Sequence, residues 1–378
     1  MKIMFSVGEA SGDLHGAALA KALVKQVSQV EMIGMGGKHM ASAGVHLVYD
    51  IQQLGVVGIG EVIRKIPFFF RLRTYLLNVM RREKPDILIC IDYPGFNMQL
   101  MKKAKALGIP VIYYILPTIW AWNKSRGNVI ARYADLAISL FPFEAQLYKQ
   151  LGTNVIYAGH PLLDMVQPTM DKEKAYAAFD LNPQKKTVLC MPGSRLQEVQ
   201  RLLPVMMQAV QKLQQRIGNV QCIIPRAPTI SRALLERMVY PATVPVRIGE
   251  GNVYDMMQIS TAAVVASGTA TLETALMEVP TVLVYKVNRL TYTMAKLLVH
   301  VKYIGLPNII MGRRIMPELW QDKVTPQRIV SVLQPLLTNE IVHERQRCAM
   351  AMVRSALGSR GSVDRIAMEI VKFIKERS

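Results

Sequence analysis

The residues whose types and spacing most clearly suggest a chemical role form a tight turn of small residues: Ser267, Gly268, Thr269, Ala270 and Thr271. The run before the turn, 262–266, is typical of a buried strand, and the run after it is typical of a helix. A helix that begins there presents free backbone N–H groups and three hydroxyl groups to an anion. Glu273, about one turn into this helix, is suitably placed to accept hydrogen bonds from a ribose. The same residues are also compatible with an ordinary strand-to-helix turn capped by threonine.

A second turn of this kind contains Gly193, Ser194 and Arg195. It follows the strand-like run 187–191 and opens another helix. An arginine can grip a phosphate with two parallel hydrogen bonds. Two such turns in one domain predict a site for a phosphorylated ligand.

Two carboxylates in the first half of the chain also follow strand-like runs. Asp92 ends the apolar run 87–91, and partial burial there is expected to raise its pKa, as suits a general base. Glu9 follows the first strand and could position a substrate. Each has a structural alternative, since Asp92 could simply form a turn and Glu9 could brace its own loop.

Two loops of the first half contribute further candidates for substrate binding: Ser11, Gly12, Asp13, Trp120 and Trp122. Ser11 or Asp13 is expected to cap the helix that follows the first strand. Indole rings suit a sugar ring or an acyl chain, and the cations beside them suit phosphate. Core packing of one tryptophan is the alternative.

The elements that must position these residues alternate between strand-like and helix-like runs along the chain. Near-continuous apolar strands separated by helices predict parallel sheets covered on both faces. Two successive sets predict an α/β fold of two doubly wound, Rossmann-like domains, whose ligands bind outside the carboxyl ends of the strands. The predicted domains are 1–165 and 166–340, followed by a helical segment, 341–378, that returns to a first domain. The predicted strands are 3–7, 31–34, 87–92, 111–116, 136–140, 155–158, 187–191, 220–224, 246–248, 262–266 and 281–284.

Composition narrows the class of protein. Lys and Arg outnumber Asp and Glu by 46 to 27, a net charge of +19, which indicates an anionic partner. No nucleic-acid-binding motif is present, so nucleic acid is not the expected partner. The six histidines show no metal-ligand spacing, and the four cysteines are expected to be reduced. No signal peptide and no run of about 18 apolar residues is found, which predicts a cytosolic protein that at most lies on a membrane.

One segment combines aromatic residues with cations in the pattern of a helix lying in a membrane interface. Its expected membrane-facing residues are Val62, Ile63, Ile66, Phe68, Phe69, Phe70 and Leu72. Anionic lipid contributes about 1 kcal/mol per nearby cation. The alternative is a helix packed on the sheet with solvated arginines on its outer side.

Taken together, these segments resemble lipid-A-disaccharide synthase, an inverting glycosyltransferase of the two-domain GT-B type (glycosyltransferase family 19). The resemblance covers essentially the whole chain, and its many ordered matches are specific although each alone is weak. They are GEASGD at 8–13, IDYPGFN at 91–97, PTIWAW at 117–122, FPFE at 141–144, GHP at 159–161, PGSR at 192–195, SGTATLE at 267–273 and LPN at 306–308.

The resemblance implies transfer of 2,3-diacylglucosamine from its UDP donor onto 2,3-diacylglucosamine 1-phosphate, without a cofactor. Asp92 would act as base, with Glu9 as second choice. The turns at Arg195 and Ser267 would hold the diphosphate and Glu273 the ribose. Asn308 matches a position near the UDP-sugar site, with its role open. Anionic lipid on the cytoplasmic face of the inner membrane would be a further partner.

The chain departs from the family pattern at one position. The family usually carries a second acid where this chain has Gly95, so the base role in that loop falls to Asp92 alone. The C-terminal segment returns to its own first domain or crosses to a partner in a homodimer, and the resemblance is compatible with a swapped dimer. The nearest alternative function is a UDP-N-acetylglucosamine 2-epimerase or another GT-B enzyme on a soluble UDP-sugar. A basic nucleic-acid-binding protein is the remote one.

Overall fold

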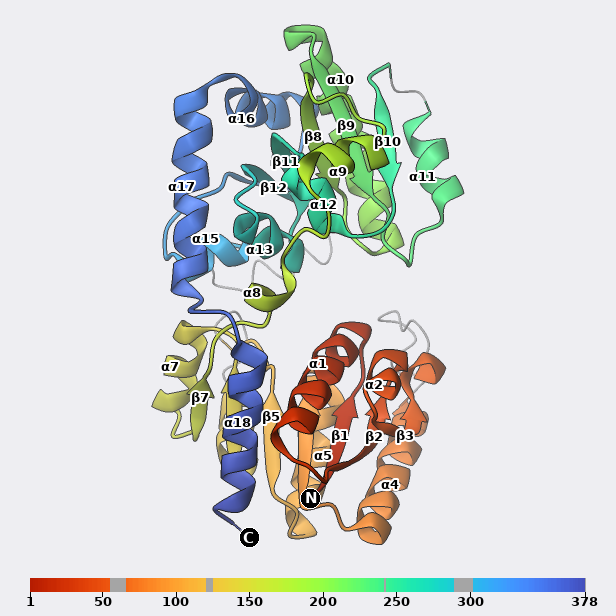
Figure 1. The fold of residues 1–378 in the computed structure, drawn as a ribbon, viewed down its shortest axis with the longest axis vertical. Coiled ribbons are helices and arrows are strands. Elements are labelled where there is room, and N and C mark those ends of the chain that lie inside the picture. The colour runs from red at the N-terminus through yellow and green to blue at the C-terminus, as the bar shows by residue number, and fades with distance from the viewer. Residues whose placement is uncertain (55–65, 120–124, 241–242, 289–301, 378) are drawn as a thin grey trace. The chain divides into compact units, whose positions relative to one another are not determined.

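The computed structural model describes residues 1–54, 66–119, 125–240, 243–288 and 302–377. The chain divides into two compact units (Figure 1), one of Met1–Pro161 with Ser359–Ser378 and one of Leu162–Gly358. The first boundary thus lies at 161/162 rather than at the predicted 165/166, because the short helix α8 (Leu162–Met165) already belongs to the second unit.

The first unit is built on a seven-stranded parallel sheet, in the order β3-β2-β1-β4-β5-β6-β7. Its central strands are apolar and buried along nearly their whole length. This is expected for a parallel sheet that helices cover on both faces. In the register of the two central strands, Val7 at the end of β1 pairs with Ile91 at the end of β4. The strands are β1 (Lys2–Val7), β2 (Glu31–Gly36), β3 (His46–Asp50), β4 (Ile87–Ile91), β5 (Val111–Tyr114), β6 (Leu136–Ser139) and β7 (Val155–Tyr157).

Helices cover both faces of this sheet. One face packs against α1 and α18, and the other against α4, α5 and α6. The helical elements of the unit are α1 (Ala10–Gln26), α2 (Lys38–Ser42), the 3-10 turn η1 (Ile51–Leu54), α4 (Ile66–Glu83), α5 (Pro94–Ala106), α6 (Ser125–Tyr133), α7 (Pro142–Gln150) and α18 (Ser362–Lys375).

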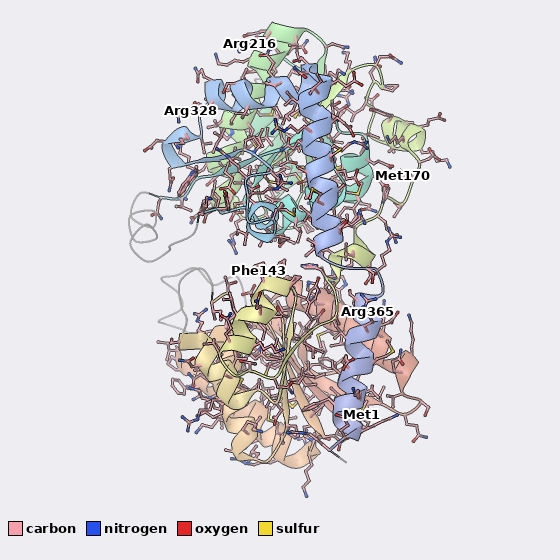
Figure 2. The ribbon with its side chains drawn as sticks, turned by 90° about the vertical axis from the view of Figure 1, so that its left-hand side faces the viewer. Met1, Phe143, Met170, Arg216, Arg328 and Arg365 are labelled. Carbon is pink, nitrogen blue, oxygen red and sulfur yellow. The ribbon has the colours of Figure 1, made fainter. Side chains whose placement is uncertain are left out.

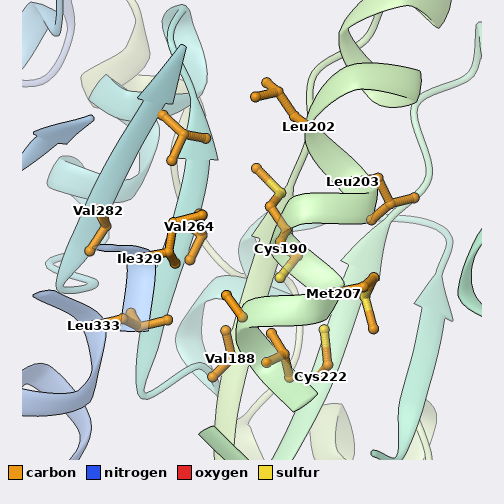
Figure 3. Packing of buried hydrophobic residues seen from close by; sticks show 14 of the residues in the cluster. Val188, Cys190, Leu202, Leu203, Met207, Cys222, Val264, Val282, Ile329 and Leu333 are labelled. Carbon is orange, nitrogen blue, oxygen red and sulfur yellow. The ribbon is translucent and has the colours of Figure 1, made fainter. Parts of the chain in front are cut away.

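The second unit repeats this plan with six parallel strands, in the order β10-β9-β8-β11-β12-β13. Figure 3 shows its larger core, in which Leu203 and Met207 of α10 and Leu333 of α16 cover strand residues such as Val188 and Val264. The strands are β8 (Lys186–Met191), β9 (Val220–Pro225), β10 (Val246–Gly249), β11 (Ala262–Ala266), β12 (Thr281–Tyr285) and β13 (Glu318–Trp320). The helical elements are α8, α9 (Lys172–Ala178), α10 (Leu196–Ile217), α11 (Arg232–Val239), α12 (Val253–Gln258), α13 (Thr269–Leu276), α15 (Leu306–Ile310), η2 (Gln321–Lys323), α16 (Pro326–Thr338) and α17 (Glu340–Ala356).

Two strands, β3 and β13, are not among the strands predicted from the sequence. Each is an edge strand of its sheet, with a neighbouring strand on one side only. β3 is half-exposed along most of its length, and β13 has only three residues. Neither has the continuous apolar run that marks the buried strands.

The C-terminal segment differs from the prediction that all of 341–378 returns to a first domain. Helix α17 stays on the second unit, where Gln346 donates from Nε2 to the Thr281 carbonyl at 2.9 Å. Only the chain from Ser359 onward belongs to the first unit, and its helix α18 packs against α1 of the same chain. Arg365 of α18, labelled in Figure 2, donates from Nε to the Ala158 carbonyl at 2.9 Å.

Both sheets reverse their strand order at one internal point. The chain leaves β1 to one side through β2 and β3 and returns on the other side at β4. It likewise leaves β8 through β9 and β10 and returns at β11. Ligands of open α/β sheets bind outside the carboxyl ends of the strands at such a point, so the loops after β1, β4, β8 and β11 are the places to look for a site.

Candidate active site

The reversal point of the first sheet carries two carboxylates, Glu9 after β1 and Asp92 after β4. Burial, together with the nearby Glu9 carboxylate, raises the pKa of Asp92 to about 6, and a hydrogen bond from the Tyr93 backbone opposes this shift. Burial disfavours the charged form, and so does a like charge. The structure therefore brings together the two acidic residues named from the sequence and makes Asp92 a stronger base than an ordinary aspartate.

The backbone at Asp92 adopts an uncommon conformation. Asp92 and Tyr93 have φ values of +50° and +52°. Residues other than glycine rarely adopt such values, and each costs about 1–3 kcal/mol of backbone strain. The Asp92 carbonyl is held by Asn97 Nδ2 at 2.8 Å and by the Tyr113 hydroxyl at 2.9 Å. Asn97 is fully buried and also receives a hydrogen bond from Ser6 of β1 at 2.6 Å. These contacts fix the position from which the Asp92 side chain projects.

The loop after β1 is shaped by close packing. A Cβ atom at Gly8 would lie 2.1 Å from the Tyr93 ring, so only glycine allows this approach. Gly12 is buried in α1, where a Cβ would meet Val7 at 2.9 Å. Ser11 is exposed in the first turn of α1. Gly12 is therefore a packing residue, which corrects its assignment to substrate binding.

Asp13 has a structural role that differs from the predicted one. Its carboxylate is buried and accepts hydrogen bonds from the backbone N–H groups of Gly37 at 2.8 Å, His39 at 3.1 Å and Met40 at 3.1 Å. It thus caps α2, not the helix on which it lies. With both oxygens used in this way, Asp13 is not a substrate ligand.

The aromatic segment of α4 is only partly exposed. Leu72 is 4% exposed and lies in the core, which corrects its assignment to the membrane-facing residues, because the helical stripe it begins faces the sheet. Phe68 and Phe69 are half-buried and contact Tyr49 and Phe96, respectively. Ile66 and Phe70 remain 45% and 55% exposed. Val62, Ile63, Trp120 and Trp122 lie outside the described residues, and none of the described helices is both long and apolar enough to span a bilayer.

The reversal point of the second sheet carries the two predicted anion turns. Gly268 has φ +153° and ψ −165°, a conformation that only glycine adopts readily. Gly268 and Thr269 are exposed and Ala270 is half-buried. The backbone N–H groups of Thr269 and Ala270 lie before the first intrahelical acceptor of α13, whereas the Thr271 N–H donates to the Gly268 carbonyl at 3.1 Å. Ser267 is half-buried and its hydroxyl donates to the Ile304 carbonyl at 3.3 Å.

Thr271 departs from the prediction that its hydroxyl faces an anion. It is fully buried, and its hydroxyl donates to the Gly268 carbonyl at 2.8 Å. The hydroxyl therefore stabilises the turn itself. Among the threonines of this turn, Thr269 alone keeps an exposed side chain.

The turn after β8 presents Arg195 at the start of α10. Gly193 is half-buried, whereas Ser194 and Arg195 are exposed. The Arg195 side chain is 83% exposed, and Nη1 lies 3.2 Å from Oε1 of Glu198. The Glu198 carboxylate also accepts from the Arg195 backbone at 3.3 Å. An exposed pair of this kind contributes about 0–1 kcal/mol, so the guanidinium can exchange Glu198 for another anion at little cost.

Glu273 and Asn308, both predicted to bind the UDP-sugar, differ in how far hydrogen bonds within the protein occupy their side chains. Glu273 is half-buried on α13, accepts a hydrogen bond from the Tyr254 hydroxyl at 3.0 Å, and has its pKa raised by burial. Asn308 is fully buried and uses its whole amide internally, donating to Met316 and Glu318 and accepting from Ile315 and Met316. Asn308 therefore orders the chain around α15 and is not available to a UDP-sugar, which corrects its assignment.

Three residues that shape these sites were not predicted from the sequence to have a role in them. Asn97 and Tyr113 hold the Asp92 backbone, and Tyr254 holds Glu273. Asn97 lay within a matching motif, which was a usable signal. Tyr113 and Tyr254 are ordinary tyrosines in their elements, and only their contacts in the folded chain reveal what they do.

Comparisons with known proteins agree with this arrangement. The family model described as lipid-A-disaccharide synthetase matches residues 3–370. Lipid-A-disaccharide synthase from Geobacter metallireducens is 39% identical over 376 residues, covering 100% of this chain and 98% of the relative. The enzyme of that name from Syntrophus aciditrophicus is 40% identical over 375 residues, covering 99% and 98%.

Solved structures show the fold. The UDP-GlcNAc 2-epimerase from Neisseria meningitidis, solved with UDP-GlcNAc, has a TM-score of 0.70 at 13% identity and covers 98% of this chain and 100% of its own. The calicheamicin glycosyltransferase CalG4 has a TM-score of 0.63 at 14% identity, covering 99% and 98%. These likenesses confirm the predicted GT-B class but, at such low identity, show the fold alone. The match along nearly the whole sequence decides the family: the chain belongs to the lipid-A-disaccharide synthetase family.

Proposed function

We propose that this chain transfers 2,3-diacylglucosamine from UDP-2,3-diacylglucosamine to 2,3-diacylglucosamine 1-phosphate, giving the β-1,6-linked disaccharide 1-phosphate of lipid A and UDP. The observation that carries the proposal is the family match over residues 3–370, together with full-length relatives named lipid-A-disaccharide synthase. The epimerase alternative rests only on a fold likeness at 13% identity.

Asp92 acts as the general base. It takes the proton of the acceptor's 6-hydroxyl while that oxygen attacks the anomeric carbon of the donor. The new carbon–oxygen bond forms as the bond to the diphosphate breaks, and the electron pair of the broken bond leaves with UDP. Attack opposite an α-linked UDP inverts the anomeric centre in one step. A base with a pKa of about 6 supports this role, because it is ionised at neutral pH and still basic enough to accept a proton.

The second unit binds the leaving group. The first turn of α13, the exposed Thr269 hydroxyl and Arg195 stabilise the charge that develops on the diphosphate. Fixed donors aimed at developing charge are usually the largest catalytic term. Glu273 accepts hydrogen bonds from the ribose hydroxyls. Supporting this assignment, the turns after β8 and β11 meet at the sheet's reversal point, since Met191 pairs with Val265 in the register of those strands.

Both proposed substrates carry acyl chains, so the enzyme works at a lipid surface. We assign this contact to α4 on the first unit, directed to anionic lipid of the inner membrane's cytoplasmic face. Ile66 and Phe70 are exposed there, and the Arg73 guanidinium lies 4.6 Å from the centre of the Phe70 ring. Apolar side chains flanked by cations suit such a surface.

Mass spectrometry of the reaction products tests the proposal. Purified protein is incubated with UDP-2,3-diacylglucosamine and the 1-phosphate acceptor, and the expected product is the tetraacyl disaccharide 1-phosphate with one equivalent of UDP. A parallel reaction with UDP-N-acetylglucosamine alone, followed by proton NMR because the two epimers have equal mass, tests the epimerase alternative. Folded protein that forms no disaccharide, or that epimerises the soluble sugar, contradicts the assignment.

A further inference from the structure

Glu273, the carboxylate assigned above to the ribose, is held by a side chain from another helix. The Tyr254 hydroxyl of α12 donates to Oε1 of Glu273 at 3.0 Å. Burial raises the pKa of Tyr254, so the phenol keeps its proton and can serve as a donor. Within the described part of the chain, Oε2 of Glu273 accepts no hydrogen bond. One oxygen is therefore fixed and the other is open to a ligand.

Tyr254 is itself held in place from several directions. The Asn252 side chain caps α12 by accepting from the Tyr254 backbone N–H at 3.0 Å. The next residue, Asp255, is fully buried. Its carboxylate accepts from the Thr169 backbone at 2.7 Å, the Thr169 hydroxyl at 2.6 Å and the Met170 backbone at 3.0 Å. The short helix α12 is thus anchored on both sides of Tyr254, and the phenol meets Glu273 without having to be ordered by a ligand.

We propose that Tyr254 is a positioning residue for nucleotide binding, fixing one oxygen of Glu273 so that the other receives the ribose hydroxyls of a uridine diphosphate. This inference rests on the proposed function, because it assumes that Glu273 meets a ribose. A carboxylate that is already oriented loses less conformational freedom on binding. Removal of the phenolic hydroxyl leaves a carboxylate that must be ordered by the ligand and that lacks a partner for one buried oxygen.

The test is calorimetric titration of full-length protein with UDP and with 2′,3′-dideoxy-UDP, which lacks both ribose hydroxyls. Tyr254→Phe is expected to weaken UDP binding about tenfold, the size of one hydrogen bond to a charged group. It is expected to leave dideoxy-UDP binding unchanged, because the effect acts through the ribose. In turnover the variant raises the KM for the UDP donor and leaves kcat unchanged.

Two further variants separate positioning from general destabilisation. Tyr176→Phe is the matched control, since the Tyr176 hydroxyl donates to the Ile259 carbonyl at 3.2 Å and not to Glu273; it should leave UDP binding unchanged. In a Glu273→Ala background, Tyr254→Phe should add less than twofold, because the acceptor of the Tyr254 hydroxyl and the ribose contact are both already removed.

Several outcomes would overturn the inference. Equal weakening of UDP and dideoxy-UDP, full additivity with Glu273→Ala, or UDP binding by Tyr254→Phe that matches the wild type each contradict it while leaving the proposed function intact. A folded wild-type protein that binds no UDP contradicts the proposed function, and this inference with it.

Discussion

The two sheets of this protein share one topology and differ in the chemistry at their reversal points. After β1 and β4, the first sheet presents two carboxylates close enough for one to raise the pKa of the other. After β8 and β11, the second sheet presents helix N-termini, hydroxyls and an exposed arginine. In the function proposed above, the same geometric position accepts a proton in one unit and an anion in the other. What differs is which side chains follow the strands, since the strands themselves are alike.

Substitution of the carboxylate after β4 has the largest expected effect. Asp92→Asn removes the proposed base and keeps the side chain's size, so kcat should fall about 10²- to 10⁴-fold. Asp86→Asn is the matched control, since Asp86 precedes the same strand and accepts from the Lys2 backbone at 2.7 Å. Rates of UDP release with both lipid substrates measure the effect. Turnover by Asp92→Asn within tenfold of the wild type would give the base role to another group, with Glu9 as the next candidate.

A change at the anion turn should affect binding more than chemistry. Gly268→Ala introduces a Cβ that meets no neighbour within 4 Å, so its cost is backbone strain of about 1–3 kcal/mol. Relaxation of that strain moves the first turn of α13, and the Kd for UDP should rise about tenfold.

Gly218→Ala controls for strain alone. Gly218 also has a positive φ, +72°, and an unobstructed Cβ position. It lies at the C-terminal end of α10, whereas the Arg195 turn lies at the N-terminal end of that helix. This variant should lose stability and keep UDP affinity. Equal UDP affinities for the two variants would show that the turn at Gly268 does not bind the nucleotide.

The pH dependence tests the coupling of the two carboxylates. Asp92 must be ionised to act, so kcat/KM should fall as the pH drops through about 6, the value that burial and Glu9 give to the pKa of Asp92. Glu9→Gln removes a neighbouring negative charge and lowers that pKa, so the acid limb should shift to lower pH. Profiles with an unshifted or upward-shifted limb would mean that Glu9 does not act on the base.

The smallest expected effect concerns the outer surface of the first unit. Phe70→Ser should weaken flotation with anionic liposomes roughly fivefold, because it removes a half-exposed aromatic ring. Phe69→Ser serves as the contrast, since its ring packs against Phe68 and Phe96, and it should lower thermal stability. Unaltered flotation of folded Phe70→Ser would remove α4 from the membrane contact.

The sequence predicted those features that depend on neighbouring residues along the chain. Buried strands, the reversal-point turns and the raised pKa of Asp92 all follow from short apolar runs and the residues directly after them. It could not tell which polar side chains serve the fold. Asp13 and Asn308 occupy the predicted loops, yet Asp13 accepts from the Gly37 backbone and Asn308 from the Ile315 backbone, groups that the folded chain brings near. Thr271 instead donates to a carbonyl of its own turn, that of Gly268. Ser6 and Asn97 are 91 residues apart, and no local pattern announces such a pair.

The most direct test of the division between the two units is calorimetric titration of UDP into full-length Asp92→Asn. If proton transfer belongs to the first unit and nucleotide binding to the second, this variant should bind UDP with a Kd within about twofold of the wild type, although its turnover is lost. A Kd raised tenfold or more in a folded variant would place Asp92 among the groups that bind the nucleotide and contradict the account.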